Sequence, residues 1–441
     1  MLNHALDKLA AWMRARLHGR RFLSNVLVLA GGTAAAHGVT LAAEPILTRL
    51  YSPVQFGICA AFASAAGILQ SISSGRYERA IPIPRDERSS LGLLYLCFLI
   101  LVCATALGQV VAWLFGEPLL RWANIPQLRP YLWLVPAGLF FGSAYEVLSM
   151  WTIRTKEFTV LASTKLRRSG GTALTQLALG GLAAGPLGLI AGDMVGRILG
   201  LGALAGPIWR KHRPTMRKIS PADIKDLAVR YRRFPMLSTP AALLNRSAER
   251  LPAFLLLAFY GPAETGWYWL CQRALSVPVT LISQSVARVY IGEASEAVRT
   301  SPERLKGLFL RVGWKLFLFS LPPSAVLVAF GPWLFRIVFG PSWVEAGEYA
   351  RALGVNLPFL MCIAPLTQTL FIVERQELLL IGELARVIMI VGSMYVVCSR
   401  GLPALTAVWT YSIAAIASYS VQAGMIAWAL WGKKHPNVRE D

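Results

Sequence analysis

Long runs of apolar residues alternate with short polar segments along the whole chain. Twelve of these runs come close to the roughly 20 residues that a bilayer-spanning helix requires. They are expected near residues 24–47, 54–74, 90–115, 131–153, 168–184, 187–208, 235–260, 264–289, 307–330, 352–373, 378–399 and 404–431. The pattern predicts an all-α integral membrane protein with about twelve transmembrane helices and no large soluble domain.

Composition agrees with the apolar pattern. Of the 441 residues, 55% are hydrophobic and only 15% are charged, which argues against an ordinary soluble enzyme. The net charge of +21 is typical of proteins that meet nucleic acid or an anionic membrane surface. The apolar runs favour anionic lipids as the partner, and no nucleic acid is needed to explain the charge. The six cysteines lie inside apolar runs without CxxC spacing, so we expect no metal and no cofactor.

Positive charges gather in alternate loops, which predicts the orientation. Residues 75–89, 154–168 and 209–234 are rich in Lys and Arg, whereas the intervening loops carry few. Positively charged loops stay in the cytoplasm, so both termini are expected there. The first run also has the features of a cleavable signal peptide, but its length favours an uncleaved span.

The same pattern divides the chain into five parts. We expect a basic cytoplasmic segment at 1–22, a first six-helix lobe at 23–209, a linker at 210–234, a second lobe at 235–431 and a cytoplasmic tail at 432–441. In the linker, Ser220 can cap a helix that has Pro221 at its first position and Asp223 two residues further on. This helix is amphipathic and is expected on the inner membrane surface.

A short motif occurs twice and indicates an internal repeat. The two copies are Tyr51-x-Pro53-x-x-x-Gly57 and Tyr260-x-Pro262-x-x-x-Gly266, each at the start of the second span of its lobe. Six helices per unit preserve orientation. The lobes are therefore expected to form a parallel repeat about an axis along the membrane normal.

Several ionisable residues fall inside the expected spans, where they are costly and indicate function. Glu44 is set aside because it precedes Pro45 near a helix end, and Glu383 with Arg386 belongs to the wider set. The deepest candidates are Glu146, Asp193, Arg197, Arg246, Glu249, Arg250 and Arg273.

These charges have two competing explanations. Asp193 and Arg197 are four residues apart and can pair on one helix face, which is a structural role. Arg246 and Arg273 have fewer local partners, so we expect them to line a wet cavity that receives an anion. Guanidinium groups suit this task because they stay charged and bind phosphate or carboxylate bidentately.

Five segments resemble the Wzx-type oligosaccharide flippases of bacterial polysaccharide export, within the MATE-related flippase superfamily. The similarity covers nearly the whole chain, but it contains no single diagnostic signature. The segments are LTRLYSPVQFG (47–57), GRYERAIPIPR (75–85), NRSAERLPAFLLLAFYGPAETGWYWLCQR (245–273), FGPWLFRIVFGPSWVEAGEYARAL (330–353) and FIVERQELLLIGELARV (371–387).

The resemblance implies two lobes around a cavity that opens alternately to the cytoplasm and the periplasm. The implied cargo is an undecaprenyl-diphosphate-linked oligosaccharide, moved to the periplasmic leaflet of the bacterial inner membrane for O-antigen, capsule or exopolysaccharide synthesis. The implied partners are a polysaccharide polymerase and chain-length proteins.

We expect a cationic cavity to hold the diphosphate and buried carboxylates to carry a coupling H⁺ or Na⁺. The candidate cations are Arg197, Arg246, Arg250 and Arg273, and the candidate carboxylates are Asp193, Glu249 and Glu146.

Other classes of function stay open. A membrane polymerase or glycosyltransferase should carry a large outer loop with essential charged groups, whereas the outer loops here are short. Neither HExxH, GxSxG nor a P-loop occurs in a suitable context, so we expect a transporter and no enzyme. A MATE-like small-molecule exporter should favour an acidic cavity for cationic drugs. A lipid II flippase is the nearest alternative among flippases.

Overall fold

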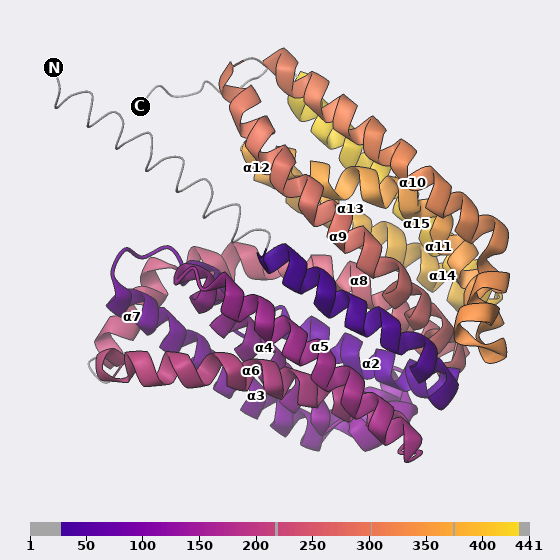
Figure 1. The fold of residues 1–441 in the computed structure, drawn as a ribbon, viewed down its shortest axis with the longest axis horizontal. Helices are drawn as coiled ribbons and strands as arrows, with labels where there is room; N and C mark the ends of the chain where they lie inside the picture. Colours follow the sequence, from indigo (N-terminus) through magenta and orange to yellow (C-terminus); the bar gives the residue numbers. More distant parts are fainter. Residues whose placement is uncertain (1–27, 217–218, 301, 374, 432–441) are drawn as a thin grey trace.

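The computed structural model describes residues 28–216, 219–300, 302–373 and 375–431. Within these ranges the chain is nearly all helical and contains no β-strand (Figure 1). The expected segment 1–22 and tail 432–441 lie outside the described residues. Each of the twelve expected spans overlaps a helix.

The first group of helices, here the first bundle, precedes the linker. It contains a helix over residues 28–50, α2 (Pro53–Gln70), the short η1 (Tyr77–Ala80), α3 (Glu87–Trp122), η2 (Pro126–Tyr131), α4 (Leu134–Arg154), α5 (Phe158–Gly181) and α6 (Pro186–Met216).

The second bundle follows linker helix α7 (Pro221–Arg230) and a π-helical turn, η3 (Phe234–Ser238). Its elements are α8 (Thr239–Tyr260), α9 (Pro262–Thr300), α10 (Pro302–Phe339), η4 (Pro341–Trp343), α11 (Val344–Leu366), α12 (Gln368–Ile372), α13 (Gln376–Val387), η5 (Ile388–Gly392), α14 (Ser393–Ser399) and α15 (Ala404–Trp431).

Seven helical segments in the described part of the chain are long and apolar enough to cross a membrane. Among the helices outside this set are α5 and α8. Lys165, Arg167 and Arg168 lower the hydropathy of α5, and Arg246, Glu249 and Arg250 lower that of α8. Charged residues therefore weaken the apolar signal of these two helices.

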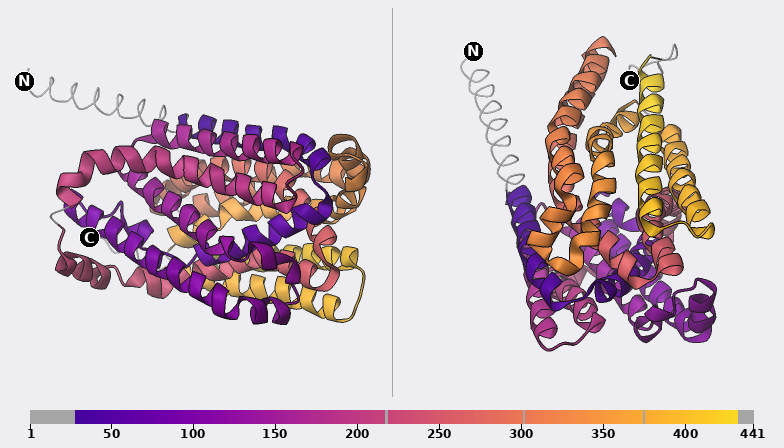
Figure 2. Two further views of the ribbon diagram at one scale, coloured as in Figure 1. Left: turned by 90° about the horizontal axis from the view of Figure 1, so that it is seen from below. Right: turned by 90° about the vertical axis from the view of Figure 1, so that its right-hand side faces the viewer.

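The two bundles converge at one end of the molecule and diverge at the other (Figures 1 and 2). The beginnings of α2 and α9 lie at the convergent end, whereas α7 and α12 lie toward the divergent end. The two bundles are thus held together mainly at one end.

A close crossing of α2 and α9 joins the bundles at the convergent end. A Cβ atom at Gly57 would overlap the carbonyl oxygen of Pro262, and a Cβ at Gly266 would overlap that of Pro53. The four residues come from the two copies of the repeated motif. Each copy thus supplies the glycine that admits the backbone of the other copy.

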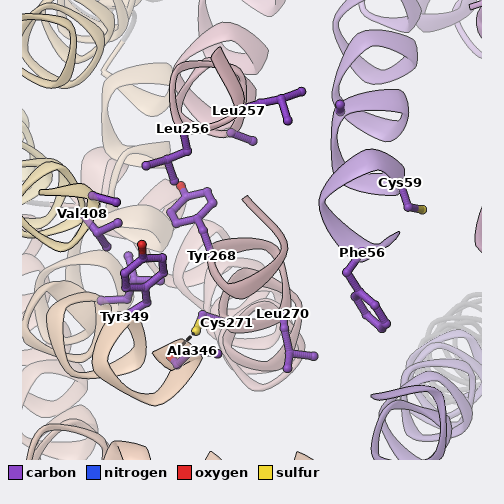
Figure 3. Packing of buried hydrophobic residues seen from close by; sticks show 14 of the residues in the cluster. Phe56, Cys59, Leu256, Leu257, Tyr268, Leu270, Cys271, Ala346, Tyr349 and Val408 are labelled. Carbon is purple, nitrogen blue, oxygen red and sulfur yellow. Dashed lines mark hydrogen bonds between the residues drawn. The ribbon is translucent and has the colours of Figure 1, made fainter. Parts of the chain in front are cut away.

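Aromatic and apolar packing extends this junction. The Trp343 indole is 1% exposed, donates to the carbonyl oxygen of Thr48 at 2.9 Å and meets the Phe56 ring edge-on at 4.9 Å. The buried cluster continues through α8, α9, α11 and α15, where the Cys271 thiol donates to the Ala346 carbonyl oxygen (Figure 3). One continuous apolar core therefore spans both bundles.

The linker helix α7 is docked on the first bundle. The predicted capping box is confirmed, because the Ser220 hydroxyl accepts from the Asp223 amide and the Asp223 carboxylate accepts from the Ser220 amide. Arg88 pairs with Asp223 at 2.7 Å, and Leu227 is buried against the first bundle. These hydrogen bonds, first that from the Ser220 amide and then that from Arg88, lower the pKa of Asp223.

The α2–α9 crossing predicts a strong penalty for one added methyl group. Gly57→Ala and Gly266→Ala should each destabilise the protein by about 1–3 kcal/mol through overpacking against backbone. The measurement is the thermal midpoint of the purified protein in detergent.

Gly292→Ala on α9 is the matched control, because nothing lies within 4 Å of its added Cβ. Helix propensity favours alanine there, so the midpoint should stay or rise. If Gly266→Ala and Gly292→Ala change the thermal midpoint equally, the close approach of α2 and α9 does not make Gly266 necessary for stability.

Candidate functional site

A cavity of about 610 Å³ lies within the second bundle and carries most of the candidate charges. Its walls come from α8, α9, α11, α13 and α15, and Ser64 of α2 adds a residue from the first bundle. The polar and aromatic groups on the walls include Asn245, Arg246, Glu249, Arg250, Tyr268, Gln272, Arg273, Asn356, Glu383, Arg386, Tyr411, Tyr419 and Gln422.

Three of the four predicted arginines line this cavity. Arg246 and Arg250 lie one helical turn apart on α8, and Arg273 lies on the neighbouring helix α9. Sequence spacing alone placed the first two on one helix face, whereas the packing of α8 beside α9 brings the third to them.

Two of these arginines have carboxylate partners. Arg246 pairs with Glu249 at 3.0 Å, and both side chains are almost half exposed. Arg273 pairs with Glu44 across the two bundles, and the Glu44 side chain is 2% exposed. Setting Glu44 aside as a residue near a helix end was therefore wrong. Arg273 lacked a partner in sequence only because its partner lies far away in the chain.

Arg250 differs from the other cavity arginines. No ion pair joins it to a carboxylate among the described residues, and its guanidinium lies 5.5 Å from the centre of the Trp269 ring. Its Nε atom is buried without a hydrogen-bond partner in the described chain. Like Arg246, Arg250 also lines a second, polar cavity of about 80 Å³ beside α2 and α4. It therefore offers a guanidinium without an ion-pair partner in the described chain, at the seam between the bundles.

The fourth arginine, Arg197, is placed elsewhere. It pairs with Asp193 at 2.8 Å, as the spacing predicted, and donates to the Gly138 carbonyl oxygen at 2.9 Å. Arg197 is 7% exposed and packs inside the first bundle, outside the residues that line the large cavity. Glu146 lines the small cavity, where it pairs with Arg79 at 3.7 Å.

Sequence reasoning gave too little weight to Glu383 and Arg386. They form an ion pair of 2.7 Å on α13, and both side chains are nearly buried. The Asn245 amide donates to Glu383 at 3.3 Å. Their spacing of three residues inside an apolar run was the available signal.

Within the described chain, no group of three or more His, Cys, Asp or Glu side chains is placed to hold a metal ion.

Solved structures with this fold include transporters and a flippase. An inward-facing multidrug MATE transporter is 17% identical with a TM-score of 0.62, over 92% of this chain and 96% of its own. The lipid II flippase MurJ in an inward closed conformation is 12% identical with a TM-score of 0.70, over 91% and 87%. A MOP superfamily transporter from Pyrococcus furiosus is 17% identical with a TM-score of 0.53, over 92% and 96%.

The fold is therefore that of the MATE-related transporter and flippase superfamily, and the chain is a multi-pass membrane protein. Residues 46–348 match the model of a family described as polysaccharide biosynthesis protein, and the chain belongs to that family. No curated protein sequence matches the chain significantly.

The Glu44–Arg273 ion pair should stabilise the protein, so replacing either residue alone should cost more than its share of the double replacement. Arg273→Met should cost about 3–5 kcal/mol, because it leaves the buried Glu44 carboxylate without its cation. The double variant Glu44→Gln/Arg273→Met should recover part of this loss. The measurement is the thermal midpoint of the purified protein in detergent.

Arg246→Met is the control for this comparison, because its ion pair is half exposed and should contribute about 0–1 kcal/mol. If the double variant is as unstable as the two single variants combined, Glu44 and Arg273 do not stabilise the protein as a pair.

Proposed function

We propose that this protein is a flippase that moves an undecaprenyl-diphosphate-linked oligosaccharide from the cytoplasmic to the periplasmic leaflet of the bacterial inner membrane. The observation that carries this proposal is Arg250, a partly buried guanidinium without a carboxylate partner among the described residues, at the seam beside a 610 Å³ cavity. Membership of a polysaccharide biosynthesis family supports a glycan as the cargo.

In this proposal the chain spans the membrane twelve times, with both termini in the cytoplasm. The lobes are residues 23–209 and 235–431, and the linker 210–234, with its docked helix α7, lies at the inner membrane surface near anionic lipids. The reciprocal contact between the two motif copies supports a parallel repeat. With this orientation the convergent end is periplasmic, and the structure corresponds to an inward-open state.

The diphosphate is proposed to bind at Arg250, with Arg246 and Arg273 beside it. A phosphate oxygen accepts from guanidinium more strongly than from neutral donors, so an uncompensated Arg favours this group. Ion pairs partly neutralise the charges of Arg246 and Arg273, so these two residues contribute less to binding the diphosphate. Arg197 has its own partner, so we assign it to holding Asp193 within the first lobe.

Translocation then requires the periplasmic junction to open while the cytoplasmic end closes. Opening must withdraw Trp343 from Thr48 and separate Gly57 from Pro262. The lipid tail stays in the bilayer, so only the polar head group needs the cavity. Carboxylates supply sites for a coupling H⁺ or Na⁺. Glu249 lies in the large cavity, Glu146 lines the small cavity between the lobes, and Asp193 pairs with Arg197 in the first lobe.

This assignment predicts that export depends most strongly on Arg250. In cells lacking the wild-type protein, Arg250→Met at matched expression should restore at most about a tenth of surface polysaccharide, a loss equivalent to roughly 1.4 kcal/mol or more. Arg246→Met should restore an intermediate amount. The measurement is the quantity of surface polysaccharide, with cytoplasmic-leaflet lipid-linked oligosaccharide measured in parallel.

The matched control is Arg121→Met, because Arg121 is an exposed residue of α3 that pairs with Glu117 away from the cavity. It should restore export fully. Full restoration by Arg250→Met would remove the residue on which the proposed diphosphate site depends.

A further inference from the structure

The small cavity at the seam between the bundles is lined by arginines from both sides. Arg76 comes from the first bundle, whereas Arg246 and Arg250 come from the second. The two second-bundle arginines also line the large cavity. An anion that is held by Arg250 can therefore contact groups in both cavities.

Arg250 reaches across the seam to α2 of the first bundle. A Cβ atom at Gly67 would lie 3.6 Å from the Arg250 Nε atom, which is ordinary van der Waals contact. The Nε atom itself is buried, but the two terminal nitrogens of Arg250 are neither buried nor hydrogen-bonded within the described chain. These nitrogens are therefore free to donate to a ligand where the two cavities meet.

Arg76 faces the same cavity from the loop that follows α2. Its Nη1 atom lies 3.5 Å from the Glu78 carboxylate, but its guanidinium makes no hydrogen bond within the described chain. Burial lowers the pKa of Arg76, and repulsion from Arg79 and Arg246 lowers it further, whereas nearby carboxylates act in the opposite direction. The effect of Arg246 shows that the two bundles present positive charges to each other across the seam.

The backbone of Arg76 lies in the left-handed region, with φ at 59°, and the preceding Gly75 has φ at 57°. Residues with a side chain rarely adopt this conformation, so glycine would suit position 76 better than arginine. Strained residues of this kind concentrate at functional sites. The chain thus places a guanidinium here although the backbone favours glycine.

The carboxylates of the small cavity already have partners in the first bundle. Glu78 accepts from the Ser74 hydroxyl at 2.6 Å in addition to its ion pair with Arg76. Glu146 pairs with Arg79 at 3.7 Å. These contacts leave the positive charge of Arg250 without a carboxylate partner among the described residues that line the cavity.

The size of the cavity limits what it can hold. A volume of about 80 Å³ has room for several water molecules, because one water needs roughly 10–15 Å³. This space suits a group of the size of one phosphate. Phosphate oxygens accept strong hydrogen bonds from guanidinium groups, and here such groups approach from two sides.

We propose that the small cavity holds one phosphate group of the cargo diphosphate, bound by Arg76 of the first bundle and Arg250 of the second. The other phosphate group lies on the large-cavity side of Arg250. The inference rests on the proposed flippase function, which it deepens by adding a binding residue and by making the site complete only when both bundles contribute.

The test is calorimetric titration of the full chain in phosphatidylcholine nanodiscs with inorganic pyrophosphate and, separately, with inorganic phosphate. Wild-type protein should bind pyrophosphate about tenfold more tightly than phosphate, or more, because hydrogen bonds to charged groups contribute this much. Arg76→Met should remove most of this preference, since phosphate can still bind at Arg250. Arg250→Met should abolish the binding of both anions.

Two further variants separate binding from folding. Arg76→Met/Glu78→Gln removes both members of the ion pair, so no buried carboxylate is left without its cation and the net charge of the cavity is unchanged. It should lose the preference for pyrophosphate as Arg76→Met does. Arg76→Lys keeps the charge but loses the planar fork, and should keep only part of the preference. Thermal midpoints establish that each variant folds.

Arg85→Met is the control with the same chemical change. Arg85 is exposed in the loop between η1 and α3, and it lines neither cavity. This variant should bind both anions as the wild-type protein does. A loss of preference in Arg85→Met equal to that in Arg76→Met would overturn the assignment, because it would reflect the charge of the loop.

A second arm identifies the source of the phosphate. Undecaprenyl diphosphate in the nanodiscs should occupy the site and block pyrophosphate binding, whereas the same fraction of phosphatidylglycerol should not. Equal blocking by phosphatidylglycerol would overturn the proposal, because the cavity would then bind phospholipid head groups in general.

The outcomes also separate this inference from the proposed function. Pyrophosphate binding that requires Arg250 but is unchanged in both Arg76→Met variants overturns the two-bundle site and leaves the flippase proposal standing. Binding that requires both arginines, in a protein whose deletion leaves surface polysaccharide unchanged, supports the site and counts against the flippase.

Discussion

The crossing of α2 and α9 is the contact on which the arrangement of the two bundles depends. Two glycines allow two backbones to approach so closely that a single methyl group on either would meet a carbonyl oxygen. Each motif copy contacts the other at this junction. Two further contacts join the bundles: the hydrogen bond from Trp343 to Thr48 and the Glu44–Arg273 ion pair.

The carboxylates around the large cavity pair with all but one of its described arginines. Around the large cavity, Arg246, Arg273 and Arg386 each face a carboxylate, and Arg250 alone among the described cavity arginines has none. Buried charge is costly unless it is paired, so the paired arginines are explained by structure. Arg250 requires a different explanation, and the anion that we propose to bind there supplies one. Its contact with the Trp269 ring lowers the cost of keeping the guanidinium there.

Apolar run length was enough to predict the helices, and short-range spacing predicted the Asp193–Arg197 pair and the Ser220 cap. These features depend on residues within one or two helical turns. The Glu44–Arg273 pair could not be predicted in this way, because it joins helices whose proximity arises only when the bundles pack. The same limit explains Arg197: periodicity places it on a helix face, but only packing decides which neighbour that face meets. Glu249 pairs with Arg246, as their i,i+3 spacing on one helix allows.

Transport by the isolated protein tests the central claim most directly. The purified chain would be reconstituted into liposomes that contain an undecaprenyl-diphosphate-linked oligosaccharide, under an imposed proton or sodium gradient. The fraction of glycan protected from a membrane-impermeant glycosidase is then followed over time. The account predicts that wild-type protein exposes the protected glycan much faster than protein-free liposomes do, and that the Arg250→Met protein does not. Equal rates with and without the wild-type protein under both gradients would contradict it.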